Sequence, residues 1–175
     1  MKIIVAAAFA VLAVAMAGCQ TAPVDYSPTS TMVAKGAVQV GDFRYLPALN
    51  GKVKPNQLRN TALGPILLTP HIDTFYRDAV FKELRFVGVN ISDSKLQLSG
   101  DIVDFLVDDL GFSVDWKIDV KYAVKDASGA TIYEGEKFTN NNTAKFANAF
   151  QVLNTQIRLN IEELLKDPAF IKAIN

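Results

Sequence analysis

The stretch FSVDWKIDVKYAVK, residues 112–125, decides the fold of this chain, because it alternates between large apolar and polar residues without interruption. A period of two residues is that of an extended strand, whose successive side chains point to opposite faces. The pattern predicts a strand with one buried and one exposed face, as in an antiparallel sheet covered on one side. The residues expected to point inward are Phe112, Val114, Trp116, Ile118, Val120, Tyr122 and Val124.

The segments on either side of this stretch predict two further strands of an antiparallel meander. Residues 126–129, with the sequence DASG, indicate a hairpin turn that leads into a return strand at 130–139. Residues 96–108 predict the preceding strand. Its apolar parity changes near Ile102 and Val103, which indicates a bulge or two buried faces.

Helical spacing and helix-start residues predict three helices. Thr69 and Pro70 match the cap and first position of a helix that Gly88 ends. The polar loop 140–143 is expected to cap a second, long helix, and Asp167-Pro168 begins a short terminal one. The apolar stripes are Ile72, Phe75, Ala79, Val80 and Leu84 in the first helix, and Phe146, Phe150, Leu153, Ile157, Ile161 and Leu164 in the second.

A first strand is expected at 38–45, with a bulge at Gly41, followed by a long Pro- and Gly-containing loop at 47–69. Within that loop, 66–68 is a candidate short strand. The element order β-α-β-β-β-α, with a short C-terminal helix, predicts an α+β fold over residues 37–175. We expect a two-layer α/β sandwich with a mainly antiparallel four-stranded sheet and two helices on one face.

The first eighteen residues predict an export signal rather than part of the fold. Lys2 precedes an apolar run that is too short for a comfortable membrane span. The run ends in Met16-Ala17-Gly18-Cys19, which resembles the lipobox of bacterial lipoproteins, with Met16 in place of the usual Leu. The alternative is a plain secretory signal with a chance cysteine.

The lipobox resemblance implies that Cys19 becomes the first residue of the mature chain and carries a diacylglyceryl group and further acyl lipid. It also implies a lipid-anchored protein on the periplasmic face of the outer membrane, because Gln20 is not the Asp that retains such proteins in the inner membrane. Residues 19–36 are rich in Thr, Ser, Pro and Ala and predict a flexible tether.

Composition excludes several classes of site. The chain of 175 residues has 18 basic and 18 acidic side chains, one His and one Cys. Balanced charge argues against nucleic-acid binding, and the Cys and His counts exclude a disulfide framework and a zinc site rich in these ligands. The single histidine, His71, is expected at the start of the first predicted helix. Neither a nucleophile elbow nor a phosphate-binding loop is present, so we expect no enzymatic activity, no catalytic residue, no metal and no cofactor beyond the lipid on Cys19.

Four carboxylates leave one enzymatic alternative open. Asp101, Asp104, Asp108 and Asp109 cluster in sequence, but their spacing matches no calcium loop. We expect solvated strand and turn residues here. The alternative is a hydrolase of cell-wall material that uses these acids.

Two binding hypotheses remain. The first places a protein partner, or a second copy, on the exposed sheet face at Asp115, Lys117, Asp119 and Lys121, with the edge strand and residues 47–69 as further contacts. The second is a lipid or glycolipid carrier or sensor with an apolar groove between helices and sheet. That groove would be lined by residues such as Phe75, Trp116, Phe146 and Phe150.

Four stretches together resemble the YajG-type outer-membrane lipoproteins, a family of uncharacterised function. They are Met16–Cys19, LLTP at 67–70, LQLSGDIVDF at 96–105, and the ending from Asn148-Ala149-Phe150 to DPAFI at 167–171. The order of elements is also similar to LptE and to the auxiliary lipoproteins of ABC-type lipid transport. This resemblance implies a protein that binds a partner in envelope assembly or transport, and it carries over no catalytic residue.

Overall fold

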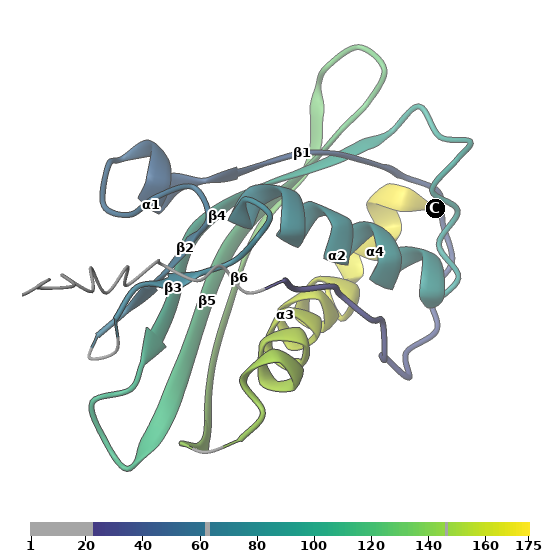
Figure 1. The fold of residues 1–175 in the computed structure, drawn as a ribbon. Helices are drawn as coiled ribbons and strands as arrows, with labels where there is room; N and C mark the ends of the chain where they lie inside the picture. Colours follow the sequence, from purple (N-terminus) through teal and green to yellow (C-terminus); the bar gives the residue numbers. More distant parts are fainter. Residues whose placement is uncertain (1–22, 62–63, 146) are drawn as a thin grey trace, which may run out of the picture.

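The computed structural model describes residues 23–61, 64–145 and 147–175. Its central strand is β5 (Ser113–Lys125), which pairs antiparallel with β4 (Gln97–Asp108) on one side and with β6 (Thr131–Ala144) on the other (Figure 1). The inward residues of β5 from Val114 to Val124 are at most 8% exposed, and polar residues alternate with them. The predicted meander is therefore confirmed.

The other edge of β4 is shared by two short strands. β1 (Gln39–Tyr45) pairs parallel with its first half, and β2 (Gln57–Asn60) pairs parallel with its end. β3 (Ile66–Leu67) then pairs antiparallel with β2. The sheet thus has six strands and is mixed, whereas the sequence predicted four mainly antiparallel ones, because strands of two to four residues show no readable periodicity.

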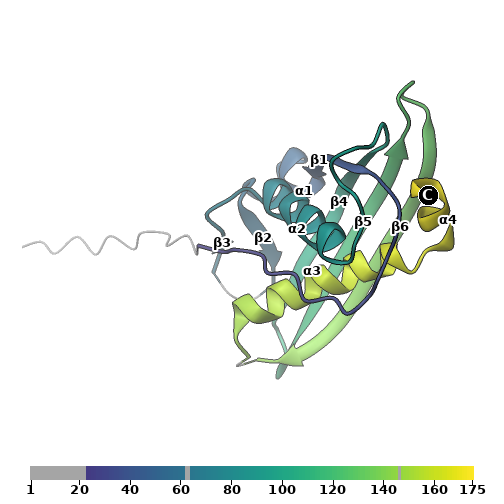
Figure 2. The same ribbon diagram turned by 90° about the vertical axis from the view of Figure 1, so that its right-hand side faces the viewer.

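Two long helices cover one face of this sheet, as predicted (Figure 2). They are α2 (Ile72–Phe86) and α3 (Ala149–Leu165), and the short α4 (Pro168–Ile174) follows. A further short helix, α1 (Leu46–Leu49), precedes β2 in the segment expected to be a loop. The α+β class with helices packed on a sheet is confirmed.

Local signals place some helix ends well and others only within two residues. The Asp167 side chain caps α4 by accepting from the Ala169 N–H, and Gly88, with φ of 104°, follows the end of α2. His71, and not Thr69, occupies the cap position of α2, and its side chain makes no capping bond. His71 is exposed there.

Both predicted bulges are present. The pairing of β4 with β5 shifts register between Ile102 and Asp104, and that of β1 with β4 shifts between Val40 and Phe43, around Gly41. A shift of one residue exchanges the two faces of a strand, which explains the parity changes in the sequence.

The polar segment 140–143 does not cap α3, which corrects the prediction. These residues extend β6 and pair with residues 114–117 of β5, and Asn148 caps the helix by accepting from the N–H groups of Phe150 and Gln151. Asparagine is depleted in strands, so the local sequence favoured a loop, but pairing with the long β5 prevails.

The described part of the predicted tether packs on the domain. Residues 23–36, defined here as the strap, run in an irregular, extended path across the helical layer (Figures 1 and 2). Tyr26, Ser30 and Ala34 of the strap are buried. The expectation of a flexible segment therefore does not hold for these residues, because their side chains and backbone bind both long helices.

Two buried carboxylates hold the strap. Glu83 of α2 accepts hydrogen bonds from the Tyr26 hydroxyl and, at 2.7 Å, from the Ser30 N–H. Glu162 of α3 accepts from the Ser30 hydroxyl at 2.7 Å and also pairs with Arg158. Buried carboxylates require such partners, so the strap supplies hydrogen-bond donors to Glu83 and a second partner to Glu162 beside Arg158.

Candidate functional site

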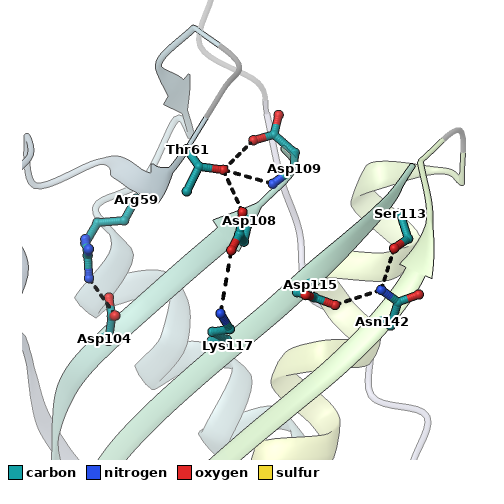
Figure 3. Close-up of polar contacts among 9 residues, drawn as sticks. All are labelled: Arg59, Thr61, Asp104, Asp108, Asp109, Ser113, Asp115, Lys117 and Asn142. Atoms are coloured by element: carbon teal, nitrogen blue, oxygen red, sulfur yellow. Dashed lines mark hydrogen bonds and ion pairs between the residues drawn. The ribbon is translucent and has the colours of Figure 1, made fainter. Parts of the chain in front are cut away.

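The uncovered face of the sheet, called the outer face here, carries all four surface residues that the sequence singled out. Asp115, Lys117, Asp119 and Lys121 point to this face from β5. Figure 3 shows part of it, with side chains from β2, β4, β5 and β6 on one side of the sheet and the helices behind. The four residues therefore do share one surface, as the period of two predicted.

Ion pairs across strands neutralise most of the acidic cluster 101–109. Arg44 pairs with Asp101 through two nitrogens, at 2.6 and 2.5 Å, and Arg59 pairs with Asp104 at 2.5 Å. Lys117 lies 3.6 Å from Asp108. The structure thus distributes these acids along β4, each beside a cation, which is an arrangement typical of a sheet surface.

Asp109 differs from the other three acids of the cluster because it is buried. It is 1% exposed, and the Thr61 hydroxyl contacts the carboxylates of both Asp108 and Asp109 at 3.0 Å (Figure 3). That hydroxyl also accepts from the Asp109 N–H at 3.0 Å. These contacts fix the end of β4 beside the tip of β2.

The remaining outer-face residues form a second polar group over β5 and β6. Asn142 donates to Asp115 and to the Ser113 hydroxyl, each at 2.7 Å, and Lys121 lies 4.0 Å from Glu136. Partial burial, followed by the nearby Glu136 carboxylate, raises the pKa of Asp119 to about 6. Among the four predicted surface residues, Asp119 is thus the one whose ionised form is disfavoured by its surroundings.

An apolar groove lies at the end of the sandwich where β4 and β6 end and β5 and α3 begin. This cavity, called the apolar groove from here on, has a volume of about 210 Å³. Its apolar lining residues are Leu58, Ile66, Leu68, Val107, Val114, Trp116, Ala144, Ala147, Ala149, Phe150, Val152 and Leu153, and its polar ones are Asp109, Thr143 and Lys145.

Two of the four residues expected to line such a groove do so. Trp116 and Phe150 contribute to it, whereas Phe75 lies against the strap and Phe146 lies outside the described residues. The Trp116 indole N–H donates to the Thr143 hydroxyl at 3.0 Å. A groove between α3 and the sheet is therefore present at one end of the sandwich, with Trp116 and Phe150 of the expected lining residues.

Exposed apolar side chains lie at this end of the sandwich, and the sequence interpretation had not placed Leu110 and Phe112 among the groove residues. Leu110 is 72% exposed and Phe112 fully exposed, and Phe150 is 49% exposed. Phe112 was expected to point inward, but β5 begins at Ser113 and Phe112 belongs to the turn. The sequence feature that could have revealed these exposed residues is the pair of apolar residues flanking Gly111, since turns usually carry polar residues.

Lys145 completes the mouth. Its ammonium donates to the backbone carbonyls of Asp109 and Gly111, at 2.9 and 3.0 Å, and so ties the start of the β6–α3 loop to the β4–β5 turn. The groove therefore has an apolar interior and a polar edge that includes one cation.

The described residues hold neither a cluster of metal ligands nor a membrane-spanning helix. Within residues 23–61, 64–145 and 147–175, no group of three or more His, Cys, Asp or Glu side chains is placed to hold a metal ion. No helix in this part of the chain is long and apolar enough to cross a membrane. Cys19 lies outside the described residues, so its lipidation stays a prediction.

Comparisons with known proteins support the fold alone. No model of a known protein family matches the chain. No curated protein matches it either. The hypothetical protein CT253 from Chlamydia trachomatis has a similar structure, with a TM-score of 0.54 and 10% identity, over 80% of this chain and 99% of that one.

Two lipoprotein structures are similar at a lower level. A minor lipoprotein from Acinetobacter baumannii gives a TM-score of 0.38 and 10% identity, over 79% of this chain and 91% of that one. Lipoprotein GNA1162 from Neisseria meningitidis gives 0.33 and 9%, over 75% of this chain and 99% of that one. TM-scores this low carry no argument about function, and the resemblance to YajG-type proteins stays a prediction.

Proposed function

We propose that this chain is a lipid-anchored lipoprotein on the periplasmic face of the outer membrane that binds a protein partner in envelope assembly or transport. It acts by binding and not by catalysis. The observation that carries the proposal is the free edge of β6, beside the uncovered outer face. The anchor rests on the lipobox-like Met16–Cys19, and the choice of membrane rests on Gln20.

β6 provides an unusually open edge. It spans 14 residues and pairs only with β5 among the described residues. Its second half, FTNNNTA at 138–144, contains no charged residue and no proline. Charged residues and proline are what usually prevent an edge strand from pairing with another chain. An extended segment of a partner can therefore add to the sheet here through backbone hydrogen bonds.

The neighbouring side chains suit recognition rather than chemistry. Phe138 is 60% exposed at this edge and supplies an apolar contact. The outer-face ion pairs leave no strong excess of one charge, so the face favours a neutral, extended partner segment. Lys117 and Lys121 lie on β5, the strand next to β6. Their side chains are therefore close to those of a strand added to the β6 edge.

A second function, lipid binding by a carrier or sensor, is favoured by one specific observation, the apolar groove. The groove shares Thr143 and Ala144 with the end of β6, whereas residues 138–142 of the edge are not part of its lining.

Site-specific photocrosslinking in cells tests the protein-binding proposal. A photoreactive residue at Phe138 or Asn142 should yield one discrete heterologous adduct, identified by mass spectrometry. A photoreactive residue at the exposed Lys95, which lies in the loop before β4, serves as the control. Asn140→Lys should weaken the adduct at least about tenfold, because a charge at an edge opposes strand addition.

Three outcomes contradict the proposal. They are equal labelling from Lys95, no adduct at either β6 position, and an adduct that contains only a second copy of this chain. The last outcome would make β6 a self-association edge.

A further inference from the structure

Exposed apolar side chains lie at the end of the sandwich that holds the apolar groove. Phe150 lines the groove, and Leu110 and Phe112 flank Gly111, whose carbonyl accepts from the groove residue Lys145. Leu110 and Phe112 lie in the β4–β5 turn, and Phe150 lies in the first turn of α3. Both elements lie at the same end of the sandwich (Figures 1 and 2). Exposed apolar side chains gathered around a groove indicate a surface that is covered in use.

The strap enters the domain beside this groove. Pro23, Val24 and Asp25 lie against Thr69 and Pro70, which directly follow the groove residue Leu68. The Asn154 amide, next to the groove residue Leu153, donates to the Asp25 carbonyl at 3.2 Å. The described chain thus starts close to the groove.

The length of chain ahead of Pro23 limits the distance to the anchor. Four Cα–Cα steps join Cys19 to Pro23, and an extended chain covers about 14 Å in that number of steps. A lipid on Cys19 therefore holds the groove end of the domain near the leaflet. This step rests on the lipid anchor of the proposed function.

We propose that the apolar groove receives one acyl chain of a phospholipid from the leaflet that holds the anchor, while Leu110, Phe112 and Phe150 insert among the neighbouring lipids. A volume of about 210 Å³ is below that of sites for drug-sized ligands and suits a stretch of a single hydrocarbon chain. The aromatic and aliphatic lining gives such a chain apolar contacts along its length.

The polar edge of the groove suits a headgroup. The Lys145 ammonium uses two of its donors on the carbonyls of Asp109 and Gly111, and an ammonium has three. A phosphate at the mouth is within the field of this cation. Asp109, also in the lining, is bound by Thr61, and its carboxylate keeps the polar edge close to neutral overall.

Trp116 reports directly on the groove. It is the only tryptophan of the chain, it is 6% exposed, and it lines the groove. Its fluorescence therefore comes from the proposed site alone.

The test uses the lipidated full chain reconstituted into vesicles of phosphatidylethanolamine and phosphatidylglycerol, with or without bromine atoms along one phospholipid acyl chain. Brominated vesicles should lower Trp116 emission by about a factor of two, because the quencher must reach van der Waals contact. Ala149→Phe, which fills the groove, should abolish the quenching, and Ala147→Phe is a second filling variant. Leu110→Ser with Phe112→Ser should abolish it as well.

Phe86→Ser is the matched control. Phe86 is 57% exposed, comparable to Phe150, but lies at the end of α2. This variant should leave the quenching unchanged. Near-ultraviolet circular dichroism of each variant checks that the fold is retained.

Each other outcome overturns the proposal in a recognisable way. Quenching that persists in both filling variants means that Trp116 meets lipid outside the groove. Absence of quenching in the lipidated wild-type chain means that the groove is empty or holds the unbrominated chains of its own anchor. The mass of the purified chain reports the lipid on Cys19 separately, so failure of the anchor and failure of the groove are distinguishable.

Discussion

Asn160 joins the helical layer to the sheet through four hydrogen bonds. Its side-chain oxygen accepts from the hydroxyls of Tyr76 and Tyr122, at 2.8 and 2.9 Å, and its amide donates to the carbonyls of Ile118 and Lys137. All of this lies within the core, where Asn160 is fully buried. Helical periodicity alone does not reveal this role, since it depends on three other elements.

We expect Asn160→Leu to lower the free energy of unfolding by about 3 kcal/mol, because it leaves buried donors and acceptors without partners. Urea denaturation followed by circular dichroism measures this change. Asn154→Ala, which removes a bond at the strap surface, is the control and should cost about 1 kcal/mol or less. Equal effects of the two variants would show that the buried network contributes nothing special.

Asp119 makes stability depend on pH. Its pKa is raised to about 6 by partial burial and by Glu136, above the unfolded value near 3.8. The folded chain therefore binds more protons than the unfolded chain between about pH 4 and pH 6, and stability falls as pH rises through this window. At neutral pH the ionised Asp119 is unfavourable.

We therefore expect Asp119→Asn to raise the free energy of unfolding at pH 7 by roughly 1 kcal/mol, a value reduced for the solvent that still reaches the side chain. The gain should disappear at pH 4. Glu136→Gln should shrink the same pH dependence, because it removes a like charge. Urea titrations at both pH values measure the effect, and a gain that is independent of pH would contradict the assignment.

At the scale of elements, the strap was the least expected feature, although the sequence contains a signal for it. Val24, Tyr26, Met32 and Ala34 share one parity, and they are the partly or fully buried apolar residues of the segment. Thr, Ser and Pro between them favoured a tether. An extended segment can thus keep a period of two without joining a sheet, when helices provide the surface that it covers.

We expect the free energy of unfolding of a chain that starts at residue 37 to be about 3 kcal/mol lower than that of a chain that starts at residue 23. The loss combines the buried Tyr26 side chain with the hydrogen bonds to Glu83 and Glu162. Both chains lack the leader and Cys19, so the anchor does not enter the comparison, and denaturation of each gives the result. Lys35→Ala, at an exposed strap position, should have little effect.

At the scale of the whole molecule, we expect membrane attachment to depend on Cys19, which precedes the described residues. Each buried CH₂ group of an acyl chain contributes about 0.8 kcal/mol, so the several acyl chains expected on Cys19 would hold the protein permanently. Cys19→Ser should move the protein from the membrane fraction to the soluble fraction. Gln20→Asp should move it from the outer to the inner membrane, as the lipobox resemblance implies.

Cell fractionation with density separation of the two membranes measures both outcomes, and Thr21→Ser serves as the control. Retention of the Cys19→Ser chain in membranes would mean that the domain itself, and not the lipid, provides the attachment. Inner-membrane location of the wild-type chain would contradict the prediction for Gln20.

The sequence by itself determined the central strand, its hairpin, both bulges and the Asp167 cap, because each depends on residues adjacent in the chain. Only the tertiary structure decided which strands share the edge of β4, how far β6 extends, and where the strap lies. It also decided that Phe112, which the alternation had placed inward, turns outward ahead of β5. These features depend on contacts between segments distant in sequence, and local periodicity carries no information about such contacts.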